Sequence, residues 1–166
     1  MKQLYLTGFM GSGKSTVGSI LAEQLGVQGV DTDRLIEEQE KMSISEIFGT
    51  YGEEYFRSLE TDLLKELPDD NILIITGGGM VLKPENRRWM KENGVVIYLR
   101  CEMDEIKRRL QHDTSRPLLS GKRIREIQSV FDERKGLYEE AEIIVDTTGK
   151  KPDFIAREIV ECLKSR

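Results

Sequence analysis

The chain has 166 residues, 38% of them hydrophobic, which is enough to bury one hydrophobic core, so we expect residues 1–166 to form a single domain. Its net charge of -5 favours a small-molecule ligand over nucleic acid, because contacts to the phosphate backbone normally require an excess of basic residues. The two cysteines make no disulfide framework or metal motif and no apolar run approaches the ~18 residues that span a bilayer, so we expect a cytoplasmic protein without membrane contact.

The first half of the chain alternates short apolar runs with helical patterns. Residues 72–75, Ile-Leu-Ile-Ile, form a continuous apolar run, which is typical of a strand buried on both faces of a sheet. In chain order, the pattern predicts a strand at 4–6, a helix at 15–25, a strand at 28–31, helices at about 34–41, 43–48 and 52–67, and the strand at 72–75.

The second half continues the alternation and adds one polar segment. Pro84 is well placed to open a helix, because proline is favoured at the first helical position. In chain order, the pattern predicts a helix at 84–93, a strand at 95–99, a helix at 103–110, a polar segment at 112–122, a helix at 123–140, a strand at 142–146 and a helix after Pro152.

Five strands joined by connections of about helix length predict an α/β fold. The expected architecture is a three-layer sandwich in which helices flank a five-stranded parallel sheet. In such folds, ligands bind beyond the carboxyl ends of the strands. Gly8, Asp31 and Gly77 each follow a predicted strand, so residues far apart in the sequence are expected to converge on one site.

Residues 8–16 read Gly-Phe-Met-Gly-Ser-Gly-Lys-Ser-Thr and satisfy the spacing G-x-x-x-x-G-K-[ST] of a phosphate-binding loop. The glycines let backbone N–H groups approach phosphate oxygens, and the following helix directs the positive end of its dipole at the same anion. Lys14 can reach the β- and γ-phosphates, and the Ser15 hydroxyl can ligate Mg²⁺, so the motif predicts a bound triphosphate. The predicted contacts are Gly11, Ser12, Gly13, Lys14, Ser15 and Thr16.

Asp31 and Asp33 come at the end of the second predicted strand. One carboxylate can hold Mg²⁺ or its waters, and the other can orient or deprotonate an attacking hydroxyl, as a kinase requires. The alternative is that this Asp-x-Asp pair only caps the following helix.

Several other candidates carry little weight by themselves. Three consecutive glycines at 77–79 can offer bare N–H groups at a strand end, but such a triplet also arises by chance. Arg57 lies three residues before Glu60 on a predicted helix, so the simplest interpretation is a solvated ion pair. Arg134 has the pattern of ordinary surface charge.

The polar segment at 112–122 is a candidate lid. Arg116 lies within it, in the stretch Ser-Arg-Pro-Leu-Leu, where closure could bring the guanidinium against a transferring phosphoryl group and exclude water. His112, the only histidine, is expected on the loop surface.

Taken together, five stretches resemble the shikimate kinase family, whose fold is that of the nucleoside-monophosphate-kinase-like P-loop NTPases. The resemblance runs along essentially the whole chain. The five stretches are residues 8–16, Asp31-Thr32-Asp33, Phe56-Arg57-Ser58-Leu59-Glu60 after Gly52-Glu53, Gly77-Gly78-Gly79, and Arg116-Pro117-Leu118-Leu119.

The resemblance implies roles for residues that spacing alone leaves ambiguous. Shikimate would be bound within the helical segment at about 33–62 and by groups beyond it, namely Asp33, Arg57, Gly77, Gly78, Gly79 and Arg134. ATP would contact Arg109, the lid arginine Arg116, Lys150 and Pro152, and Mg²⁺ would be held by Ser15 and Asp31. Lys14, Asp33 and Arg116 would be catalytic. Gly136 stands where the family often has proline, and residues 148–151 are one variant of a variable loop.

The resemblance therefore implies an ATP-dependent kinase that phosphorylates the 3-hydroxyl of shikimate in aromatic amino-acid biosynthesis, and we expect a monomer. Two alternatives remain at this stage. One is another small P-loop kinase, for gluconate or a nucleotide. The other is a related protein that binds its ligands without turnover.

Overall fold

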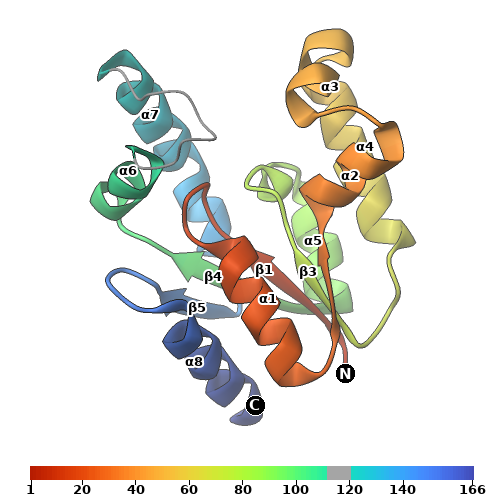
Figure 1. The fold of residues 1–166 in the computed structure, drawn as a ribbon. Coiled ribbons are helices and arrows are strands. Elements are labelled where there is room, and N and C mark those ends of the chain that lie inside the picture. Colours follow the sequence, from red (N-terminus) through yellow and green to blue (C-terminus); the bar gives the residue numbers. More distant parts are fainter. Residues whose placement is uncertain (112–120) are drawn as a thin grey trace.

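The computed structural model describes residues 1–111 and 121–166, and the described strands form one parallel sheet. The strand order is β2-β3-β1-β4-β5, so the chain crosses over the sheet between strands instead of forming hairpins (Figure 1). The strands are β1 (Gln3–Thr7), β2 (Gln28–Asp31), β3 (Ile72–Ile75), β4 (Gly94–Arg100) and β5 (Ile143–Asp146). This confirms the predicted five-stranded parallel sheet.

Helices cover both faces of the sheet. Successive strand residues point to opposite faces, so each strand packs side chains against both layers of helices. Leu4 and Leu6 pack against α1 and α8 on one face, whereas Tyr5 packs against the helices of the other face. The α1 and α8 helices lie side by side in front of the sheet in Figure 1. The helices are α1 (Lys14–Leu25), α2 (Thr32–Glu40), α3 (Ile44–Tyr51), α4 (Glu53–Glu66), α5 (Pro84–Asn93), α6 (Met103–Gln111), α7 (Gly121–Tyr138) and α8 (Pro152–Lys164).

The helices α2, α3 and α4 have a small hydrophobic cluster of their own. Its buried members are Ile36, Ile47, Phe56 and Leu63, and the Phe48 ring lies 5.0 Å from that of Phe56. In Figure 1 this group rises at one side of the sheet, and α6 and α7 rise at the other. Both groups stand beyond the carboxyl ends of the strands, so the space between them is where a ligand is expected.

The structure differs from the prediction at the ends of a few helices and in one short turn. The second helix begins at Thr32 rather than at about residue 34, since Asp31 already caps it. A 3₁₀ turn, η1 (Met80–Leu82), was not predicted and follows the glycine triplet directly. The predicted lid, with Arg116 and His112, lies outside the described residues except for its last two positions, which begin α7.

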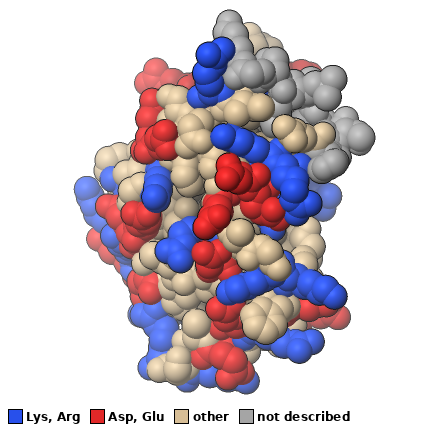
Figure 2. Space-filling view, turned by 90° about the vertical axis from the view of Figure 1, so that its left-hand side faces the viewer, with Lys and Arg blue, Asp and Glu red and all other residues tan. Residues whose placement is uncertain are grey.

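The described helices include none that is long and apolar enough to cross a membrane. Figure 2 shows the face that carries α6, α7, β5 and α8, and acidic and basic side chains are interspersed over it.

Candidate active site

The loop between β1 and α1 has the conformation that its glycines permit. Gly11 and Gly13 adopt φ values of 78° and 91°, in the left-handed region that favours glycine. The Ser12 N–H donates to the Phe9 carbonyl at 3.1 Å, which closes a turn before the helix begins at Lys14. The loop therefore ends at a helix N-terminus, where backbone N–H groups are available to an anion.

Lys14 folds back over this loop. Its Nζ donates to the carbonyl oxygens of Gly8 at 2.6 Å and Phe9 at 3.1 Å. The ammonium group is thus held at the mouth of the loop, where it is expected to meet the outer phosphates of a nucleotide. The contact with nucleotide phosphates stays a prediction of the motif.

Asp31 makes two contacts at the junction of β2 and α2. Its Oδ2 accepts a hydrogen bond from the Ser15 hydroxyl at 3.1 Å, and its Oδ1 accepts one from the Arg34 N–H at 3.2 Å. The second contact is a helix cap, so the capping alternative holds for this residue. The first places a carboxylate and a hydroxyl side by side next to the phosphate-binding loop, which suits the hard oxygen ligands that Mg²⁺ prefers.

Asp33 lies in the first turn of α2 and faces the glycine triplet. Burial and the neighbouring Asp31 carboxylate raise the pKa of Asp33, against the opposing charges of Lys14 and Arg57. A carboxylate with a raised pKa is a stronger proton acceptor than an exposed aspartate. Asp33 is therefore equipped to take a proton from a hydroxyl bound beside it.

Arg57 is held in place by two carboxylates and an aromatic ring. Its guanidinium forms ion pairs with Glu60 at 2.6 Å and Glu53 at 3.3 Å, and it lies 5.2 Å from the centre of the Phe56 ring. The Glu60 side chain is fully buried and the Arg57 side chain is 12% exposed, so the interpretation as a solvated ion pair is wrong. Burial raises the pKa of Glu60, and Arg57 opposes that shift.

The glycine triplet has three different neighbours, one from each of three helices. A Cβ atom at Gly77 would overlap the Asp33 carboxylate, and a Cβ at Gly79 would overlap the Arg57 guanidinium. A Cβ at Gly78 would lie 3.5 Å from the Arg134 Nη1. None of the three glycines has a positive φ, so Gly77 and Gly79 are needed for close approach and not for an unusual backbone conformation, whereas a Cβ at Gly78 would make only ordinary van der Waals contacts.

Two adjacent hollows lie along the phosphate-binding loop, and some of the groups described above line them. The first has a volume of about 240 Å³ and runs from the phosphate-binding loop past Asp31 and Asp33 to Gly77 and Gly78. The second has a volume of about 490 Å³ and brings together residues predicted to contact ATP. Gly13 and Thr16 line both hollows. The predicted residues around the second hollow are Arg109, Lys150 and Pro152.

Arg109 is tied to the phosphate-binding loop. Its Nη1 donates to the Gly11 carbonyl at 3.1 Å, and its Nε pairs with Glu105 at 3.2 Å. Thus the predicted site residues within the described ranges gather beyond the carboxyl ends of the strands. Arg116 lies outside those ranges.

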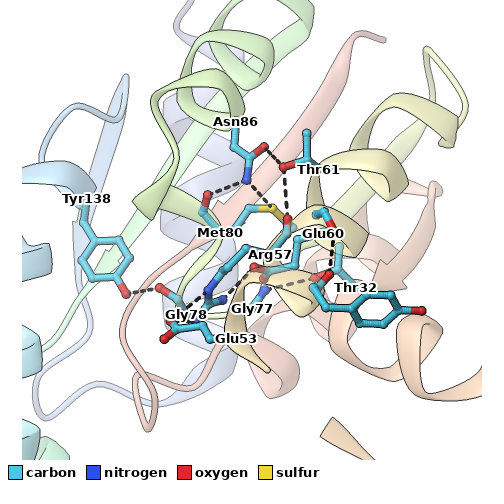
Figure 3. A network of polar contacts seen from close by, with 12 residues as sticks. Thr32, Glu53, Arg57, Glu60, Thr61, Gly77, Gly78, Met80, Asn86 and Tyr138 are labelled. Atoms are coloured by element: carbon cyan, nitrogen blue, oxygen red, sulfur yellow. Dashed lines mark hydrogen bonds and ion pairs between the residues drawn. The ribbon is translucent and has the colours of Figure 1, made fainter. Parts of the chain in front are cut away.

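Sequence reasoning missed the residues that fix the glycine triplet (Figure 3). The Gly77 N–H donates to the buried Thr32 hydroxyl at 3.0 Å, and the Tyr138 hydroxyl donates to the Gly78 carbonyl. Asn86, in the first turn of α5, donates to the Met80 carbonyl at 3.0 Å. Only Thr32 carried a signal in the sequence, since it stands between the two aspartates.

Comparisons with known proteins agree with this geometry. The family model described as shikimate kinase matches residues 10–164. A shikimate kinase of Bacillus cereus (strain G9842) is 47% identical over 161 residues, which cover 97% of this chain and 98% of that protein. The solved structure of shikimate kinase from Acinetobacter baumannii in complex with shikimate is 34% identical, with a TM-score of 0.91, and the match covers 99% of this chain and 94% of that one.

A gluconokinase from Sinorhizobium meliloti 1021 is also similar in structure, with a TM-score of 0.64. It is only 16% identical, although the match covers 99% of this chain and 92% of that one. This likeness shows a shared fold and nothing about the substrate.

Proposed function

The chain belongs to the shikimate kinase family, and on that premise we propose that its strand-end cleft transfers the γ-phosphoryl group of ATP to the 3-hydroxyl of shikimate. The products are shikimate 3-phosphate and ADP. The observation that carries the residue assignments is the convergence of Asp33, Arg57 and Arg134 on the glycine triplet, next to the phosphate-binding loop.

This convergence suits an acid that also carries hydroxyl groups. Two guanidinium groups from different helices can bind one carboxylate with planar, paired hydrogen bonds. The Asp33 carboxylate can accept a hydrogen bond from a hydroxyl on the same molecule. We therefore assign Arg57 and Arg134 to the shikimate carboxylate, and Asp33 to its hydroxyls, with Gly77, Gly78 and Gly79 forming the floor of the site.

We assign the nucleotide to the two hollows that meet at the phosphate-binding loop. The loop N–H groups and Lys14 would hold the phosphates, and Arg109 would lie against the base, with Lys150 and Pro152 opposite. Ser15 and Asp31, whose oxygens lie 3.1 Å apart, would hold Mg²⁺. When bound, Mg²⁺ neutralises the charge that develops on the transferring phosphate.

In the proposed reaction, the 3-hydroxyl oxygen of shikimate forms a bond to the γ-phosphorus, and the bond from that phosphorus to the β–γ bridging oxygen breaks. Asp33 takes the hydroxyl proton, and its raised pKa favours this step. Lys14 stabilises the charge on the phosphate oxygens. We keep Arg116 as the lid arginine on the resemblance alone.

Three broader assignments are proposed with the activity. Residues 1–166 would form one kinase domain in which the helical segment at about 33–62 binds shikimate. The protein would act as a monomer in the cytoplasm. Size-exclusion chromatography with light scattering tests the oligomeric state, since a monomer has a mass of 19.1 kDa.

ADP production measured against shikimate, gluconate and nucleoside monophosphates tests the proposed function. We expect turnover with shikimate only, and phosphorus NMR of the product should place the phosphate on the 3-hydroxyl. Turnover with gluconate or a nucleotide in place of shikimate would overturn the substrate assignment. ATP binding without ADP release in the presence of shikimate would favour a non-catalytic protein.

A further inference from the structure

The Gly78 carbonyl accepts a hydrogen bond from Tyr138, the last residue of α7, which reaches Gly78 from the left in Figure 3. Tyr138 is 1% exposed, and its ring stacks on that of Tyr98 with 5.2 Å between centroids and 16° between planes. Because Tyr98 belongs to β4, the phenol is fixed to the sheet as well as to α7.

We propose that Tyr138 is a positioning residue for shikimate, which acts by holding the Gly78 peptide in the orientation that substrate binding needs. The inference rests on the proposed function, because it assigns a second role around the same acid-binding site.

Both peptide groups next to Gly78 are fixed by partners on the protein side. The Gly77 carbonyl accepts from the Met80 N–H at 3.1 Å, and the Gly78 carbonyl accepts from Tyr138. The described peptide bonds are all trans, so the N–H of each group points away from its carbonyl. The Met80 contact thus fixes the peptide that carries the Gly78 N–H, and the Tyr138 contact fixes the peptide that carries the Gly79 N–H. In residues 1–111 and 121–166, no acceptor is bonded to either N–H, and Gly78 lines the hollow at the phosphate-binding loop. The Tyr138 hydrogen bond therefore sets the orientation of the Gly78–Gly79 peptide beside the ligand site.

Tyr138 also fixes Gly78 relative to Arg134. The two side chains are one helical turn apart on α7, so they lie on the same face of that helix. A Cβ at Gly78 would lie 3.5 Å from the Arg134 Nη1 and 3.7 Å from the Tyr138 hydroxyl oxygen. Burial raises the pKa of Tyr138 to about 12, so the hydroxyl remains a donor at any pH at which the enzyme works.

The competing explanation is that the Tyr138 hydroxyl only satisfies a carbonyl in the core. Tyr138→Phe separates the two, because it removes one oxygen and keeps the stacked ring. Tyr98→Phe is the matched control, since it removes a hydroxyl from the partner ring of the same buried pair without touching Gly78. The measurements are kcat, the KM for shikimate, the KM for ATP and the melting temperature of both variants and the wild type.

We expect Tyr138→Phe to raise the shikimate KM about tenfold, which is the fold-change for one lost hydrogen bond, and to leave the ATP KM within about twofold. Tyr98→Phe should leave the shikimate KM unchanged. An unchanged shikimate KM in Tyr138→Phe would overturn the inference, as would an equal rise in both variants or an equal rise in the KM for both substrates. A wild-type protein that does not phosphorylate shikimate would instead refute the proposed function itself.

Discussion

Gly79→Ala tests whether close approach of the backbone to Arg57 is what the glycine triplet provides. Gly79 has φ -94° and ψ 2°, a conformation open to alanine, so the substitution introduces no backbone strain. The new Cβ would overlap three atoms of the Arg57 guanidinium, at the end of a flexible side chain. The predicted response is that Arg57 moves and the backbone stays.

The size of the effect follows from the contacts. The guanidinium must move by about 1 Å to reach ordinary van der Waals contact with the Cβ. A displacement of that size stretches the 2.6 Å hydrogen bond to Glu60 beyond the usual range. Misplacing one of two carboxylate-binding groups should cost about 2 kcal/mol of substrate binding, the lower end for a disrupted charged contact, which corresponds to an approximately 30-fold higher shikimate KM.

The fold should survive the change. Replacing glycine by alanine at an unstrained position stabilises the folded protein by about 0.4–1 kcal/mol, because it reduces the conformational freedom of the unfolded chain. This gain offsets part of the stability lost when the Arg57–Glu60 ion pair is weakened. Steady-state kinetics with shikimate and ATP varied in turn, together with far-ultraviolet circular dichroism, measures both effects. The ATP KM should change by less than about twofold, because the phosphate-binding loop is not touched.

Gly136→Ala is the matched control, since a Cβ at this position in α7 meets no atom within 4 Å. We expect it to leave the shikimate KM at the wild-type value and to raise stability by up to about 1 kcal/mol. A wild-type shikimate KM in folded Gly79→Ala would refute the reasoning, because the binding site would then tolerate a displaced Arg57.

Four further substitutions test the assigned roles. Lys14→Ala should lower kcat by at least about 10²-fold with a native circular dichroism spectrum, because it removes a charge directed at the transferring phosphate, and near-normal turnover would contradict this. Asp33→Asn should lower kcat by about 10²- to 10⁴-fold. In the wild type, kcat/KM should fall with decreasing pH through a pKa above that of an ordinary aspartate, and the pH profile of the variant should lack this fall. Arg57→Lys and Arg134→Lys should each raise the shikimate KM with little change in the ATP KM, since an ammonium cannot form the paired contacts of a guanidinium; wild-type values in both would reopen the substrate assignment.

The sheet and the phosphate-binding loop could be predicted from the sequence because their signals are local. The run at 72–75 is apolar at every position, and the structure buries all four of its residues in the interior of the sheet. The loop at residues 8–16 has fixed spacing, and its left-handed glycines are a direct consequence of its backbone path. The strand order, in contrast, is set by long-range packing and was not predicted.

The half of the site that we propose binds the acid could not be derived from spacing. Glu60 lies three residues from Arg57, so the ion pair could be predicted from the sequence. The burial of this ion pair, however, depends on how α4 packs against the glycine triplet. The proximity of Arg134 to Gly78 brings together residues far apart in the chain. Only the family resemblance assigned these residues to a substrate, because the resemblance carries information about tertiary structure that periodicity lacks.

The Asp31-Thr32-Asp33 stretch joins the two halves of the site through three consecutive residues. Asp31 accepts from Ser15 on the nucleotide side, Thr32 accepts from the Gly77 N–H, and Asp33 faces the cleft. Because the three share one strand–helix junction, the oxygens proposed to hold Mg²⁺ and the proposed base are coupled through three consecutive backbone positions. In the proposed reaction, the junction would therefore hold the acceptor hydroxyl and the phosphate in a fixed relation, which is the main contribution that a protein makes to phosphoryl transfer.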